Sequence, residues 1–200
     1  MGLFSFLKRI KFGQTKQFEP DRDDYLPSFC EDDYCQIEIV PVENKTFIKK
    51  KAKEIGELAS KSRTNYGLRE KISRGLMPVT TASEEFRTDC FEKILADFQF
   101  QRASHIRYDK SELLDCARGN TKAFGFSNFA IFFDTEEEFL KNIWLGIGLI
   151  VSAPQFDLIE NALYELGETY ELMLIDWTSL EVFDLADRTR IEKYLMGYWK

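Results

Sequence analysis

The stretch FAIFFDTEEEFLKNIWLGIGLI (residues 129–150) places a run of acidic residues between two of the most apolar segments of the chain. Aromatic and β-branched residues on both sides predict strands at 126–133 and 139–150, joined as a hairpin. Carboxylates crowded into one short connection repel each other, which favours exposure to water over a tuned acid–base pair. We therefore expect this hairpin to supply the centre of a sheet, with a bend or bulge at Gly146 and Gly148.

Further helices and strands are predicted on both sides of this hairpin. Alternation and β-rich composition predict strands over 34–40, 104–108, 170–177 and 180–185. Helical periodicity and capping residues predict helices over 44–61, 63–75, 83–98, 109–118 and 154–167, and a last helix capped by Asp187. The expected buried positions on the first helix, capped by Asn44, are Ile48, Ala52, Ile55 and Ala59. On the third helix they are Phe86, Cys90, Ile94 and Phe98, with Phe91 and Leu95 widening the stripe.

This order of elements predicts an α+β fold, in which a single layered domain packs helices on a largely antiparallel or mixed sheet. Residues 34–200 form the globular domain in this interpretation. Residues 1–33 form an N-terminal arm, made of a short basic amphipathic segment and an acidic linker.

The charge is negative and unevenly distributed along the chain. The net charge of −7 disfavours a general nucleic-acid binder. Residues 134–187 hold thirteen carboxylates and a single cation, Lys141, which gives this block a net charge of −12. Such a block attracts cationic partners, although an acidic surface also serves simply to keep a protein in solution.

The cysteines and the N-terminal sequence favour a reduced, cytoplasmic protein. The first residues, MGLFSFLKRIKFGQ, have no long apolar core and no small-residue cleavage site. The four cysteines offer no second pair of ligands beside Cys30 and Cys35, so no structural zinc site is expected. The uncharged run 143–153 is too short to span a membrane, which takes about 20 residues. Residues 1–12 offer at most a weak surface contact with a membrane.

Catalytic motifs are not recognisable. His105 is the only histidine, and the chain has no GxSxG elbow, no P-loop and no HExxH pair. Asp176 and Asp184 flank the turn of the last predicted hairpin, where two close carboxylates would hold Mg²⁺ or divide acid and base roles. They read equally well as turn and cap residues. We therefore expect no catalytic residue, no bound metal and no cofactor.

Four strings resemble, as a set, small bacterial immunity proteins of polymorphic toxin systems. They are DYCQIEIVPVENKTF (33–47), NTKAFGFSNFAIFF (120–133), NIWL (142–145) and LMLIDWTSLEVFDL (172–185). The resemblance implies a non-enzymatic protein that binds and neutralises a cognate toxin. The family pattern assigns no toxin-contacting residue by position, so none is carried over.

If the partner is a basic toxin domain, charge complementarity places its contacts on carboxylates. The candidate partner-binding residues are Glu136, Glu137, Glu138, Asp176 and Asp184, with Trp177 or Tyr170 as an aromatic anchor. Trp177 reads equally well as a core residue beside the hairpin turn. Two other functions stay open at this point: a carboxylate- or metal-dependent hydrolase, and a peripheral membrane scaffold that uses residues 1–12. The oligomeric state does not follow from the sequence.

Overall fold

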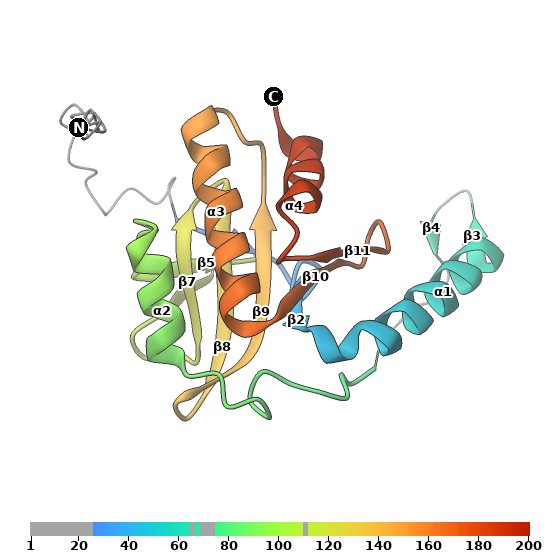
Figure 1. The fold of residues 1–200 in the computed structure, drawn as a ribbon, viewed down its shortest axis with the longest axis horizontal. Helices are drawn as coiled ribbons and strands as arrows, with labels where there is room; N and C mark the ends of the chain where they lie inside the picture. Colours follow the sequence, from blue (N-terminus) through green and yellow to red (C-terminus); the bar gives the residue numbers. More distant parts are fainter. Residues whose placement is uncertain (1–25, 65–66, 69–74, 110–111) are drawn as a thin grey trace, which may run out of the picture.

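A computed structural model describes residues 26–64, 67–68, 75–109 and 112–200 (Figure 1). The amphipathic segment predicted at 1–12 lies outside the described residues. The strands are β1 (Ser28–Phe29), β2 (Ile37–Pro41), β3 (Arg63–Thr64), β4 (Gly67–Leu68), β5 (His105–Tyr108), β6 (Glu112–Asp115), β7 (Thr121–Phe126), β8 (Phe129–Glu136), β9 (Phe139–Ile147), β10 (Leu172–Asp176) and β11 (Glu181–Asp184). The helices are α1 (Lys45–Ser62), α2 (Thr88–Asp97), α3 (Ala153–Tyr170) and α4 (Arg188–Leu195), with 3₁₀ turns at Val42–Asn44 and Met196–Tyr198.

A six-stranded sheet in the order β11-β10-β2-β9-β8-β7 organises the fold, and each neighbouring pair in it is antiparallel. The predicted α+β class is confirmed. The hairpin of residues 129–150 is also confirmed, because β8 and β9 pair along their length and lie inside the sheet. The irregularity in their register falls between Asp134 and Thr135 rather than at the glycines.

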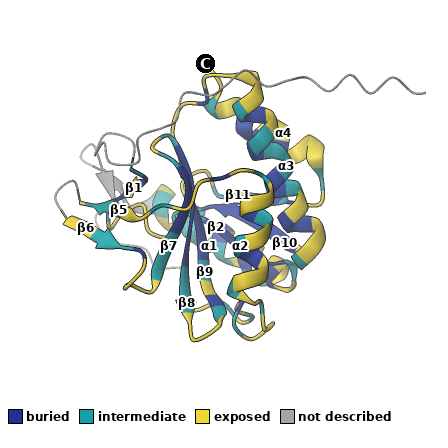
Figure 2. Ribbon diagram, turned by 90° about the vertical axis from the view of Figure 1, so that its left-hand side faces the viewer, coloured by how far each residue is buried: buried dark blue, intermediate teal, exposed yellow. Residues whose placement is uncertain are grey.

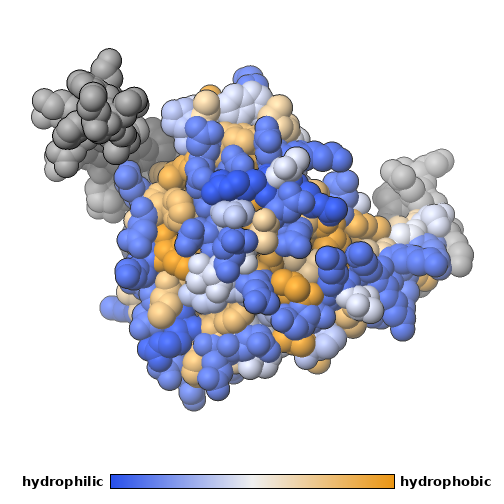
Figure 3. All heavy atoms as spheres, viewed as in Figure 1, coloured by the Kyte–Doolittle hydropathy of each residue, from blue (hydrophilic) through white to orange (hydrophobic). Residues whose placement is uncertain are grey.

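Helices α2, α3 and α4 cover one face of this sheet (Figures 1 and 2). Phe129, Ile131 and Phe133 of β8 are fully buried there, together with Ile159 and Leu163 of α3. Hydrophilic side chains cover much of the outside of this helical layer, and the apolar patches between them are separate (Figure 3). Among the described residues, no helix is long and apolar enough to cross a membrane.

Two separate pieces of the chain cover the second face. The small sheet β1-β5-β6 packs Phe29 and Ile106 against Phe132 and Trp144 of the central sheet (Figure 2). The N-terminal half of α1 instead packs Ile48 over β2 and β10, in a cluster with Val40, Met173 and Ile175. On the second face, the small sheet therefore covers β7, β8 and β9, whereas α1 covers β2 and β10.

Several predicted elements differ from the structure. Residues 112–115 form strand β6 rather than a helix, and residues 126–133 contain a turn between β7 and β8. Phe126 is the last residue of β7, and it pairs with Phe129, the first residue of β8, across a two-residue turn. The helix predicted over 63–75 is wrong for the residues that the structure describes at its start, because β3 and β4 form an antiparallel pair there.

Helix α2 begins at Thr88, and its fully buried face is only one part of the predicted stripe. Phe91 and Leu95 are fully buried, whereas Cys90 is exposed, so the assignment of Cys90 to the core is wrong. On α1, Ile48 and Ala52 are buried as predicted, but Ile55 and Ala59 are only half-buried because this part of the helix extends beyond the sheet (Figure 1). Asn44 is buried and does not cap α1. Its side-chain amide instead donates to the carbonyl of Val79 and accepts from its N–H.

Helix α3 continues through Gly167, where the prediction ends it, to Tyr170. Its N-cap is Ser152, whose Oγ accepts from the N–H of Gln155. Gly167 is buried against the chain that follows β11, where a Cβ would lie 2.5 Å from the Cβ of Leu185 and would also collide with its backbone. This glycine allows α3 to approach the end of the last hairpin.

We expect Gly167→Ala to lower the free energy of unfolding by about 1–3 kcal/mol, because the added methyl group forces α3 away from Leu185. Gly56→Ala is the matched control, since a Cβ there meets only the flexible end of Leu180, at 3.3 Å. This second substitution should gain up to about 1 kcal/mol from helix propensity. Urea unfolding of both variants measures the difference. Equal stabilities would contradict the close contact at Gly167.

Candidate functional site

The predicted acidic residues lie at the turn of the β8–β9 hairpin. Glu136 ends β8, and the exposed pair Glu137 and Glu138 forms the turn. Glu138 pairs with Arg87 at 2.8 Å, and Glu136 pairs with Lys141 at 3.5 Å. All four of these side chains are largely exposed. Exposed ion pairs contribute only about 0–1 kcal/mol to stability. Basic side chains of a partner can therefore replace Arg87 and Lys141 at little cost in free energy.

A polar row on the second face of the sheet stands directly beside this turn. Asp134 accepts hydrogen bonds from Tyr34 at 2.6 Å, from Thr121 at 2.7 Å and from Asn142 at 3.1 Å. Thr121, Asp134 and Asn142 are cross-strand neighbours on β7, β8 and β9. Burial, reinforced by the hydrogen bond to Asp134, raises the pKa of the Tyr34 phenol above its ordinary value. The row borders a shallow hollow of about 420 Å³ that Glu136 and Glu137 also line.

The structure does not bring the other candidates to this turn. Asp176 pairs with Ile37, at the opposite end of β2 from the acidic turn. Asp184 is in β11, which lies four strand spacings from β8, or roughly 19 Å. Trp177 is half-buried in the cluster under α1, and its indole N–H donates to Glu38 at 3.0 Å. Tyr170 packs against Phe86 on the helical side.

The predicted carboxylate pair does not form. Asp176 is on the helical face, where its carboxylate accepts from the N–H groups of Thr178 and Ser179 and from Tyr194 Oη. Asp184 pairs with Met173, which faces α1 on the second face, and it lines a hollow with Lys45 and Arg190. The two carboxylates therefore point away from each other. In the described residues, no group of three or more His, Cys, Asp or Glu side chains is placed to hold a metal ion.

A second hollow opens where the two halves of the central sheet part. Strands β2 and β9 pair only through Glu38 with Trp144 and Ile39 with Ile143. Beyond these pairs, β2 continues along β10 to Ile37 while β9 continues along β8 to Ile147. The hollow between them has a volume of about 640 Å³. We call it the β2–β9 slot.

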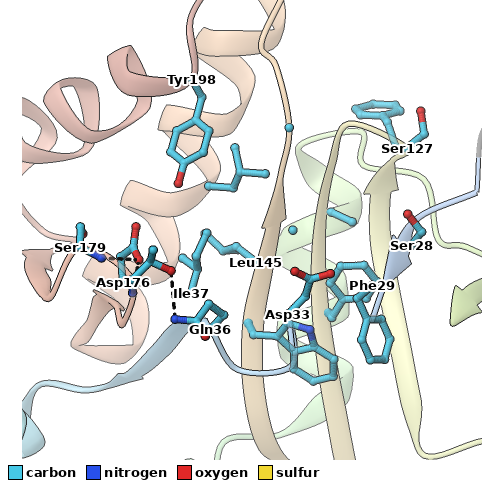
Figure 4. Close-up of a pocket in the computed structure, with 18 residues that line it drawn as sticks. Ser28, Phe29, Asp33, Gln36, Ile37, Ser127, Leu145, Asp176, Ser179 and Tyr198 are labelled. Carbon is cyan, nitrogen blue, oxygen red and sulfur yellow. Dashed lines mark hydrogen bonds between the residues drawn. The ribbon is translucent and has the colours of Figure 1, made fainter. Parts of the chain in front are cut away.

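Side chains from both faces of the sheet line the β2–β9 slot (Figure 4). Its apolar residues are Phe29, Ile37, Phe126, Ala130, Phe132, Trp144, Leu145 and Ile147, and its polar residues are Ser28, Asp33, Gln36, Ser127, Asp176, Thr178, Ser179 and Tyr198. Gly146 and Gly148 complete the lining. Figure 4 shows Asp33 and Phe29 on one side of the slot, and Gln36, Asp176 and Ser179 on the other.

The loop before β2 links the two hollows. Tyr34 lines the shallow hollow beside the acidic turn, and its ring contacts that of Trp144, which lines the slot, with 4.8 Å between the ring centroids. Sequence patterns identified neither Tyr34 nor the slot as functional. The available signals were the single acidic residue Asp134 inside an apolar strand and the two glycines of β9.

The hydroxyl groups of Tyr194 and Tyr170 provide a matched test of the contacts around Asp176. Tyr194→Phe should lower the free energy of unfolding by about 1.5–3 kcal/mol, because it removes a hydrogen bond to a buried carboxylate. Tyr170→Phe should leave it unchanged or raise it by up to about 1 kcal/mol, because the Tyr170 hydroxyl is buried without a partner among the described residues. Chemical unfolding at neutral pH compares the two variants.

The same comparison has a pH dependence. Burial, with hydrogen bonds to Tyr198 and Asp176, raises the pKa of Tyr194 above its value in the unfolded chain, about 10. The stability that Tyr194 contributes is therefore complete below pH 10 and is lost as the pH rises further. The difference between the wild-type protein and Tyr194→Phe should narrow above about pH 10. A difference that widens with pH would contradict this assignment.

Comparison with known proteins identifies no relative of this chain. No protein family, no curated protein and no solved structure matches this chain. The arrangement of the acidic turn, the polar row and the β2–β9 slot therefore carries the functional argument by itself.

Proposed function

We propose that this protein is a non-enzymatic binding protein that takes a basic protein partner at the acidic β8–β9 turn. The observation that carries the proposal is the position of Glu136, Glu137 and Glu138 at the exposed end of the β8–β9 hairpin, which has buried side chains on both of its faces. The hairpin holds these carboxylates on a rigid base, so little conformational entropy is lost when a partner binds them. The partner fits the role of a toxin domain, as the resemblance to immunity proteins suggests.

The backbone of the turn gives a second line of support. Glu137 has a φ of 56°, a conformation in which glycine or asparagine is favoured and other residues cost roughly 1–2 kcal/mol. Strained residues of this kind gather at binding and catalytic sites, where function outweighs local stability. Six other described non-glycine residues also have a positive φ, so this conformation is compatible with a binding role without being specific to the turn.

Long-range charge is also consistent with a basic partner. The block 134–187 carries a net charge of −12, and it includes the turn. Such a charge speeds the encounter with a cationic protein and discriminates against acidic ones. The resulting affinity should fall as salt is added, because exposed charges more than about 8–10 Å apart are screened at physiological ionic strength.

The proposal is tested by co-purification with the product of the reading frame adjacent to its own. We expect a basic protein to bind, and the triple variant Glu136→Lys, Glu137→Lys, Glu138→Lys to bind at least about tenfold more weakly, a loss of 1.4 kcal/mol. The matched control reverses three exposed carboxylates of α3, Asp157, Glu165 and Glu168, and should bind nearly as well as the wild type. Equal binding by the turn variant and the wild type would exclude the turn as the contact.

Glu137→Gly separates stability from binding. Glycine adopts a positive φ without strain, so this variant should gain about 1 kcal/mol in the free energy of unfolding. It should also weaken partner capture, because one carboxylate of the turn is lost. Thermal unfolding and the binding assay together check the prediction. A more stable variant with undiminished binding would show that the carboxylate of Glu137 makes no contact.

A further inference from the structure

The β2–β9 slot is lined by acidic and neutral side chains only. Among the eighteen described residues that line it, two are carboxylates, Asp33 and Asp176, and none is Lys, Arg or His. The two carboxylates lie on opposite sides of the opening (Figure 4). A ligand that enters therefore meets negative charge on both sides and no cation that would neutralise it, which favours a positively charged group.

Asp33 and Asp176 differ in how many hydrogen bonds their carboxylate oxygens already accept. Asp176 is buried and closes the β10–β11 turn, with three donors directed at its two oxygens. Asp33 is exposed, and the hydrogen bonds that its side chain accepts from the N–H and the thiol of Cys30 both end on Oδ2. Carboxylates accept roughly four hydrogen bonds, so Asp33 is the better partner for an incoming cation.

The indole N–H of Trp144 lacks a hydrogen bond. Trp144 is fully buried and lines the slot, yet its Nε1 has no acceptor among the described residues. A buried donor without an acceptor costs about 1–3 kcal/mol, which is why nearly all such groups are paired in folded proteins. The indole N–H of Trp177, by contrast, is paired with Glu38 at 3.0 Å. This nitrogen is closed off from solvent, so an acceptor oxygen in the slot gives Trp144 its missing partner only when neighbouring side chains move aside.

Two small residues that are cross-strand neighbours, Ala130 and Gly146, line the slot. Gly125 pairs with Ala130, and Ala130 pairs with Gly146, in one row of the second face. The adjacent row places Phe132 and Trp144, whose rings stack with 5.5 Å between centroids. The volume of about 640 Å³ is within the range of roughly 300–1,000 Å³ that is usual for ligand pockets. It is large enough for one or two amino-acid residues.

We propose that the β2–β9 slot receives a short basic segment of a protein partner, in which an arginine pairs with Asp33 and a main-chain carbonyl accepts from the Trp144 N–H. Arginine suits this lining better than lysine, because its planar guanidinium pairs with a carboxylate through two hydrogen bonds and packs on aromatic rings. The inference rests on the proposed function, since it describes a further contact of the same basic partner. Tyr34 lines the hollow beside the acidic turn, and its ring contacts that of Trp144, which lines the slot.

The test uses the isolated protein and a small probe. The ¹⁵N-labelled protein is titrated with N-acetyl-arginine N-methylamide, and the indole N–H signals of its three tryptophans are followed by NMR. Trp144→Phe assigns the Trp144 signal. If that variant does not fold, Trp177→Phe and Trp199→Phe assign it by elimination. We expect the Trp144 signal to move downfield with saturation, and the signals of Trp177 and Trp199 to stay in place.

Two controls isolate the charge. The citrulline counterpart of the probe has the same length and no charge, and it should bind about tenfold more weakly. Asp33→Asn should reduce binding of the arginine probe to the same level, because asparagine keeps the acceptor for Cys30 but not the charge. Asp157→Asn, an exposed carboxylate of α3, should have no effect. A Trp144 signal that the arginine probe leaves unmoved, or equal binding of the two probes, would overturn the proposal.

The outcome is distinguishable from that of the proposed function. If the acidic-turn variant loses the partner while the probe leaves the Trp144 signal unmoved, the proposed function stands and the slot proposal is overturned. If the probe binds as expected but no basic protein is captured, the chemistry of the slot is upheld and the proposed function fails.

Discussion

The burial of the β8–β9 hairpin on both of its faces is the constraint from which the rest of the structure follows. Phe129, Ile131 and Phe133 face the helices, while Phe132 and Trp144 face the small sheet. Each large apolar side chain that is fully buried stabilises the fold by about 1.5–3 kcal/mol, and it does so only if other elements cover it. An antiparallel sheet often leaves one face in water, but this hairpin requires cover on both.

The two faces meet this requirement differently. On the helical face, α2, α3 and α4 form one continuous layer, and Gly167 allows α3 to reach the last hairpin. On the second face, the small sheet and α1 cover different strands, and β2 and β9 meet between them through only two residue pairs. The β2–β9 slot lies along this seam, whereas the polar row around Asp134 crosses β7, β8 and β9 beside the acidic turn. The incomplete pairing of β2 with β9 therefore accounts for the slot.

Local patterns predicted the elements whose own residues determine them. The hairpin of residues 129–150, helix α3 with its Ser152 cap and the last hairpin were predictable because hydrophobic period and capping chemistry agree there. Residues 112–115 were mispredicted because their strand forms only by pairing with β5, which is a tertiary contact. Cys90 was placed in the core because a spacing of four fits two adjacent stripes of a helix, and packing selects the one with Phe91. The opposite orientations of Asp176 and Asp184 follow from strand register, which the composition of the turn does not reveal.

The candidate site was predictable only where it is local. The acidic turn is contiguous in sequence, so its exposure followed from charge repulsion alone. The slot is assembled from the loop before β2, the end of β9 and the β10–β11 turn, which are more than a hundred residues apart at the extremes. Its position depends on where the pairing of β2 with β9 stops. The sequence shows Gly146 and Gly148 as a break within a strand, but it does not indicate that a hollow forms there. Tyr34 then joins the two parts, because its hydroxyl bonds to Asp134 while its ring contacts Trp144. Tyr34 is therefore the side chain that connects the polar row to the aromatic residues beside the slot.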